Sequence, residues 1–206
     1  MADHIANANW QGEAALARQE AGISWLTGPG ALTLTGPAEG LLVQLTDSFE
    51  ITPEQQQAEG EAWPSQSGCV TAWTAPERNQ PAGQVTVTLS GAVTGEIYNA
   101  TGYRDHAPQA LTVQLGKGAV FTGAISATES RFTPQGVCHQ TFMNGGNEVA
   151  VTLSDGAVWE VEGAGYLTAL TVNKGCRFTG MVLVDDRMVS LQKGKTLEGL
   201  ILVLPG

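Results

Sequence analysis

The sequence has few charged residues, and most of them are acidic. Only 15% of the 206 residues are charged, and 20 acidic side chains against 10 basic ones give a formal net charge of −10. That field repels a nucleic-acid backbone and an anionic membrane surface alike. No cluster of basic residues relieves it, so we expect no nucleic-acid partner.

Cysteines and long apolar runs are also scarce. The three cysteines, Cys69, Cys138 and Cys176, are odd in number and far apart. They form neither a disulfide framework nor a metal-ligand spacing, so we expect no cofactor and no bound metal. No run approaches the ~18 apolar residues of a membrane-spanning helix, and "MADHIANANW" lacks the basic and apolar regions of a signal peptide.

Glycine-punctuated repeats are abundant instead. Four similar stretches are "LTVQLGKGAVFTGAI" from Leu111, "VAVTLSDGAVWEVEG" from Val149, "TALTVNKGCRFTGMV" from Thr168 and "RMVSLQKGKTLEGLI" from Arg187. Their turn glycines, Gly118, Gly156, Gly175 and Gly194, are 38, 19 and 19 residues apart. Within the double-length gap, "RFTPQGVCHQTFMNGGN" (131–147) is interpreted as a degenerate copy opened into a loop. A fixed period of this kind is typical of stacked repeats.

Each copy alternates apolar and polar residues, which predicts strands rather than helices. Aligning the copies places Phe121, Trp159, Phe178 and Leu197 in one interior column, and Ala119, Ala157 and Cys176 in another. We therefore predict an all-β fold: a right-handed parallel β-helix, or β-solenoid, with rungs of about 19 residues. An antiparallel β-sandwich is the alternative, although it gives no reason for the 19-residue period.

The length fits a single domain over residues 1–206. Residues 1–23 are predicted to form an N-terminal cap, because "NANWQGEAALARQEAG" (7–22) has the pattern of a short helix with Asn9 as N-cap and Gly22 as its stop. Residues 52–84, rich in proline and glutamine, are predicted to be an irregular insertion. Regular rungs are expected over residues 85–206.

The stretch "VTLSDGAVWEVEGAGYLTALTVNKG" (151–175) resembles the rungs of bacterial parallel β-helix repeat proteins, such as autotransporter passenger domains and uncharacterised β-helix surface proteins. "QVTVTLSGAVTGEI" and "LTVQLGKGAVFTGAI" are similar to the rungs that come before it in those proteins. The resemblance covers residues 84–184 and rests on core and turn positions, so it bears on fold more than on activity. It implies an extracellular or cell-surface scaffold.

Few residues offer chemistry. Glu160 and Glu162 fall on the outer face of a strand, where Arg177 one rung away is expected to form an exposed ion pair with Glu160. Asp185 and Asp186 are an adjacent acidic pair of a kind that could hold Ca²⁺, although solvated turn charges are the simpler interpretation. The richest polar stretch is "GYRDHAPQ" (102–109).

We take four residues of that stretch as candidate ligand-binding residues: Tyr103, Arg104, Asp105 and His106. The expected function is a non-enzymatic scaffold for adhesion or assembly. Its candidate partners are a carbohydrate, a host or cell-surface protein, or further copies of the chain packed end to end or laterally. The alternative is a carbohydrate-active β-helix enzyme, a polysaccharide lyase or glycoside hydrolase, that uses Asp185, Asp186, Glu160 or the 103–106 residues.

Overall fold

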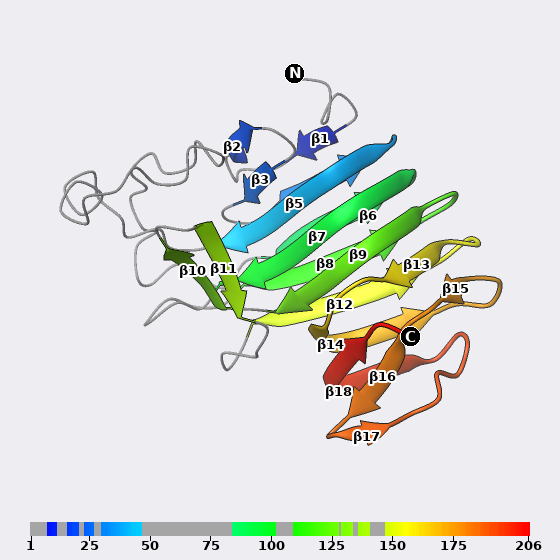
Figure 1. The fold of residues 1–206 in the computed structure, drawn as a ribbon. Helices are drawn as coiled ribbons and strands as arrows, with labels where there is room; N and C mark the ends of the chain where they lie inside the picture. The colour runs from blue at the N-terminus through cyan, green and yellow to red at the C-terminus, as the bar shows by residue number, and fades with distance from the viewer. Residues whose placement is uncertain are drawn as a thin grey trace.

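The computed structural model describes residues 8–11, 16–20, 23–26, 30–46, 84–101, 109–127, 129–133, 136–140 and 147–206 (Figure 1). Every regular element in these ranges is a β-strand, and 16 strands belong to one mostly parallel sheet. The prediction of an all-β chain is therefore confirmed for the described residues. The insertion expected over residues 52–84 lies outside them, apart from Gln84.

Two sets of parallel strands make up most of the sheet. The first ladder contains β4 (Gly30–Leu34), β6 (Gln84–Leu89), β8 (Ala110–Leu115), β12 (Glu148–Leu153) and β14 (Gly165–Val172). The second ladder contains β3 (Ile23–Leu26), β5 (Ala38–Thr46), β7 (Ala92–Ala100), β9 (Val120–Ala127), β13 (Val158–Val161) and β15 (Arg177–Phe178). From β4 to β15 these strands alternate between the two ladders along the chain (Figure 1).

The apolar residues of both ladders form one buried core, as the alternation predicts. In the first ladder Val87, Val113, Val151 and Leu170 lie in register on successive strands, and all are buried. In the second, Trp159 pairs with Phe121 on one side and Phe178 on the other. Its ring centroid lies 6.4 Å from that of Phe121 and 5.4 Å from that of Phe178, distances typical of favourable aromatic pairs. The predicted interior column is confirmed for these three residues.

Glycines allow the second ladder to pack where a side chain has no room. Gly95 and Gly123 are register partners on β7 and β9, and each has a φ of 148°. A Cβ atom on Gly123 would lie 1.8 Å from the carbonyl oxygen of Gly95. Trp159 is held at the same place, because its indole Nε1 donates a hydrogen bond of 3.0 Å to the backbone carbonyl of residue 123.

The 38-residue spacing is one long connection rather than two rungs. Leu111 on β8 pairs directly with Val149 on β12, so the two strands are neighbours in the ladder. The residues between them include β10 (Glu129–Thr133) and β11 (Gly136–Gln140), which form a separate antiparallel pair. The segment interpreted as an opened repeat copy thus contains part of a hairpin outside the ladders.

The helix expected over residues 7–22 is wrong. β1 (Ala8–Gln11) and β2 (Leu16–Glu20) lie there, paired antiparallel with β4 and β3. A short helix interrupted by Gly12 has little intrinsic stability in water. The open edges of β4 and β3, by contrast, offer a row of unpaired backbone groups with which a strand can form hydrogen bonds.

The last repeat copy also departs from the parallel register. β16 (Met181–Val184) and β17 (Arg187–Met188) form a hairpin, and β18 (Thr196–Leu204) runs antiparallel to both β14 and β16. Leu197 consequently pairs with Leu170 and does not follow Phe178 in the aromatic column. Ile201 and Val203 of β18 are buried, so this strand completes the core.

The glycine at position 123 is predicted to be essential for stability. Gly123→Ala places a methyl group against the Gly95 backbone and forces an L-residue into a φ that it rarely adopts, so we expect a loss above about 3 kcal/mol in urea unfolding. Gly156→Ala is the matched control, because Gly156 has a positive φ of 79° but no atom within 4 Å of the added Cβ. Its cost should be about 1 kcal/mol. Equal losses for the two variants would contradict the packing role of Gly123.

Candidate functional site

The two edges of the paired ladders are built differently. On one edge each first-ladder strand passes to the second ladder through a short link, such as residues 90–91, 116–119, 154–157 and 173–176. The last three links close β-turns in which Ala119, Ala157 and Cys176 donate backbone hydrogen bonds to the residue three positions earlier. We call this the turn edge.

The opposite edge carries the long connections, and we call it the loop-bearing edge. Segments 47–83, 101–109 and 128–147 each run from the end of a second-ladder strand to the start of a first-ladder strand. The strand ends are in register: Thr46 pairs with Ala100, and Asn99 with Ala127. The described strand ends that flank these three segments therefore lie along one edge (Figure 1).

The four candidate ligand-binding residues come between Thr101 and Gln109 in the chain, two residues that lie at this edge. Tyr103, Arg104, Asp105 and His106 lie outside the described residues, but the two ends of their segment are described. Gln109 donates its backbone N–H to Thr101 Oγ1 at 2.9 Å, and Thr101 is fully buried. The ends of the segment are thus held together at the edge of the core.

A buried asparagine organises the base of the loop-bearing edge. The Asn99 Nδ2 group donates to the carbonyl oxygens of Gln109 and Glu148, both at 2.8 Å. Its Oδ1 accepts hydrogen bonds from the hydroxyl and the backbone N–H of Thr101, at 2.7 and 3.2 Å. Asn147, also fully buried, donates to the Asn99 carbonyl at 2.7 Å. One side chain therefore links the ends of segments 101–109 and 128–147.

Sequence reasoning missed this network. Asn99 and Asn147 flank loops and resemble ordinary turn residues, whose polar side chains commonly bond to nearby backbone. The available signal was position: Asn99 directly follows Ile97 and Tyr98 and comes just before the polar stretch 102–109.

Tyr98 lies beside this network and is almost fully buried, at 6% exposure. Burial raises the pKa of its hydroxyl well above the usual value, and the neighbouring Glu96 carboxylate raises it further through its charge and a hydrogen bond. The loop-bearing edge therefore contains a tyrosine that strongly favours its neutral form.

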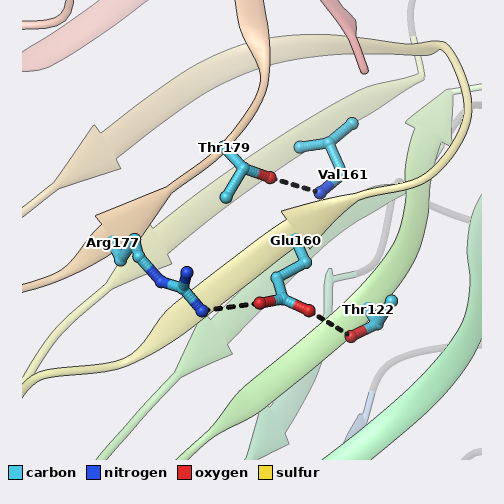
Figure 2. A network of polar contacts seen from close by, with 5 residues as sticks. All are labelled: Thr122, Glu160, Val161, Arg177 and Thr179. Atoms are coloured by element: carbon cyan, nitrogen blue, oxygen red, sulfur yellow. Dashed lines mark hydrogen bonds and ion pairs between the residues drawn. The ribbon is translucent and has the colours of Figure 1, made fainter. Parts of the chain in front are cut away.

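The outer face of the second ladder carries an exposed polar network, shown in Figure 2. Arg177 Nη2 on β15 donates to Glu160 Oε1 on β13 at 2.5 Å, and Thr122 Oγ1 on β9 donates to Glu160 Oε2 at 3.3 Å. The expected Glu160–Arg177 ion pair is confirmed. Because the two side chains are 39% and 62% exposed, the pair is worth no more than about 1 kcal/mol. The Glu160 carboxylate thus bridges β9 and β15, because one oxygen contacts Thr122 and the other contacts Arg177.

Asp185 and Asp186 form the two-residue turn of the β16–β17 hairpin. Val184 pairs with Arg187, and both aspartates have positive φ, at 49° and 61°, as a type I′ turn requires. Both are exposed. Among the described residues, no three His, Cys, Asp or Glu side chains gather as metal ligands would.

Comparisons with known proteins assign the chain to no family. No family of known proteins matches the chain, and neither a curated protein nor a solved structure does. Within the residues that the structure describes, no helix has the length and apolar character needed to cross a membrane.

Asn99→Ala should destabilise the protein by about 2–4 kcal/mol, because it removes a fully buried amide that bonds to the carbonyl oxygens of Gln109 and Glu148 and to the buried Thr101 hydroxyl. Urea unfolding measures the loss, and amide hydrogen exchange at Gln109 should accelerate. Asn173→Ala on the turn edge is the matched control and should cost less than about 1 kcal/mol. Slow exchange at Gln109 in Asn99→Ala would contradict this role.

Tyr98 should make the protein sensitive to alkali. Its pKa in the folded state lies above that in the unfolded state, so the stability it contributes is complete below about pH 10 and is lost as the pH rises above that value. We expect the free energy of unfolding to fall there by about 1 kcal/mol per pH unit from this group. Tyr98→Phe should remove that part of the decline, measured by urea unfolding from pH 8 upward. If the free energy of unfolding of Tyr98→Phe falls as steeply with pH as that of the unchanged protein, Tyr98 does not cause the decline.

Proposed function

We propose that the chain is a right-handed parallel β-helix that acts as a non-enzymatic scaffold, secreted or at a cell surface. In this proposal it binds a carbohydrate or a cell-surface protein through its loop-bearing edge. The observation that carries the proposal is that the described strand ends flanking segments 47–83, 101–109 and 128–147 lie along one edge of a rigid pair of ladders.

The β-helical part of the proposal is supported by the strand order. Successive strands alternate between two parallel ladders that share one core, and Val151 pairs with Leu170 after 19 residues. Connections between parallel neighbouring strands are overwhelmingly right-handed, which favours that hand here.

A binding role is supported by the difference between the two edges, one flanked by long connections and the other by short links. Binding residues in many folds lie on loops held by a rigid framework. Here the framework is buried and register-locked, and Asn99 ties the ends of two of the three long segments to it. The described links from the first ladder to the second on the turn edge, by contrast, are short and offer little surface for recognition.

The test is retention of the labelled full chain on insoluble cellulose, chitin and peptidoglycan and on a mucin-coated surface. Replacing Arg104 and His106 together by alanine should reduce retention on the best probe by about tenfold, as loss of central contacts does. Lys117→Ala with Lys174→Ala, two exposed lysines of the turn edge, is the matched control and should leave retention unchanged.

Two results would contradict the proposal: no retention on any of these probes, or retention that falls only in the turn-edge variant. Far-ultraviolet circular dichroism and the urea midpoint of each variant show that a loss of retention is not a loss of fold.

A further inference from the structure

An apolar groove of about 370 Å³ lies at the C-terminal end of the second ladder. It is lined by Phe178, by residues of the β16–β17 hairpin and by the segment that follows. Met181, Met188 and Lys193 are among its lining residues. Its volume falls within the range of about 300–1,000 Å³ that is usual for small-molecule sites.

The groove exists because the aromatic column is interrupted. Phe121, Trp159 and Phe178 stack in register, and the repeat places Leu197 next in line. The antiparallel course of β18 instead pairs Leu197 with Leu170. Phe178, half-buried, consequently has no successor on its outer side, and the space that the next rung would fill remains an apolar hollow.

The walls of the hollow expose apolar surface. Met188 is 72% exposed and Met181 is 41% exposed, both large values for hydrophobic side chains. Methionine is unbranched and polarisable, so it adapts to irregular apolar ligands. A wall of this kind fits a flexible acyl chain better than a rigid polar molecule.

The groove is formed by a part of the chain, residues 174–206, whose net charge is opposite in sign to that of the rest. Residues 174–206 hold five basic and three acidic side chains, whereas residues 1–173 hold five basic and seventeen acidic ones. Lys193 is the charged residue of the lining, and its ammonium group donates to the Cys176 carbonyl at 2.9 Å. That bond positions the ammonium and leaves two N–H donors for a ligand.

We propose that this groove binds a small amphiphilic carboxylate, with its apolar chain against Phe178, Met181 and Met188 and its carboxylate on Lys193. The apolar chain replaces the missing rung residue, and the carboxylate forms a charge-assisted hydrogen bond. Because screening limits the effect of distant charges to about 10 Å at 0.1 M salt, the acidic remainder of the chain does not cancel this local attraction. The lining shares no residue with segments 47–83, 101–109 and 128–147, and the proposal does not depend on the proposed scaffold role.

Methionine methyl NMR with sodium decanoate as the probe tests the proposal on the full chain. The protein has four methionines, of which Met181 and Met188 line the groove. Decanoate should shift these two methyl signals saturably and leave those of Met1 and Met143 in place. The neutral 1-decanol should bind more weakly, and decyltrimethylammonium more weakly still, because Lys193 repels it.

Lys193→Gln should weaken decanoate binding by about tenfold and remove the preference for decanoate over 1-decanol. Lys195→Gln, an exposed lysine outside the lining, is the matched control and should change the affinity by less than about twofold. Met188→Ala should weaken all three probes together, because it removes apolar contact without changing charge.

The proposal is overturned if decanoate and 1-decanol bind equally, or if the shifts persist in Lys193→Gln at unchanged affinity. It is also overturned if the Met181 and Met188 signals depend on protein concentration and decanoate does not compete. Sedimentation velocity would in that case identify the groove as a contact between copies of the chain.

Discussion

In-register parallel pairing is the constraint on which the rest of this structure depends. Because neighbouring strands lie about 4.8 Å apart, each side chain is placed against its counterpart on the next strand. A column must therefore hold residues that tolerate one another, as Phe121, Trp159 and Phe178 do in the core. Where the backbones approach too closely for any side chain, only glycine fits, and Gly95 and Gly123 occupy that place.

The same constraint explains why connections of very different length are tolerated between neighbouring strands. Gly30 pairs with Val85 after 55 residues, Val85 with Leu111 after 26, Leu111 with Val149 after 38 and Val151 with Leu170 after 19. The ladder fixes where a strand starts and ends but not how much chain lies between. Since loop-closure entropy grows only slowly with length, such additions cost little while the register is kept. The buried hydrogen bonds of Asn99 reinforce the points where the chain leaves and returns.

The sequence predicted the features that arise from local alternation and missed those that depend on strand direction. Alternation correctly identified the core column around Trp159, the buried Cys176 and the outward Glu160 beside Arg177. It does not distinguish parallel from antiparallel pairing, because both expose every second side chain. The reversal of β18 was therefore invisible, and Leu197 was placed in the wrong column.

Two further features escaped prediction for different physical reasons. The segment that holds β1 and β2 has the composition of a helix, yet edge pairing outweighed its weak intrinsic preference. The Asn99 network was missed because a buried asparagine is recognisable only from its partners, and Gln109 and Glu148 reach it through the fold. The candidate residues 103–106 lie outside the described residues, so they stay a prediction, although the ends of their segment are fixed.

Antiparallel strands at both ends give the ladders a way to stop. β1 lies against β4, β2 against β3, and β18 against β14, each reversing the direction of the strand that it covers. Antiparallel pairs space their hydrogen bonds differently from parallel ones, so the covering strand does not offer the next parallel strand the same template.

The second ladder ends differently, at the two-residue β15. Just before this strand, the Lys193 ammonium donates a hydrogen bond to the Cys176 carbonyl. This hydrogen bond takes up a backbone acceptor just before β15 that a further strand would otherwise use. The reversal that closes the first ladder also withdraws Leu197 from the second, so the apolar hollow lined by Phe178 is a direct consequence of how the stack is terminated.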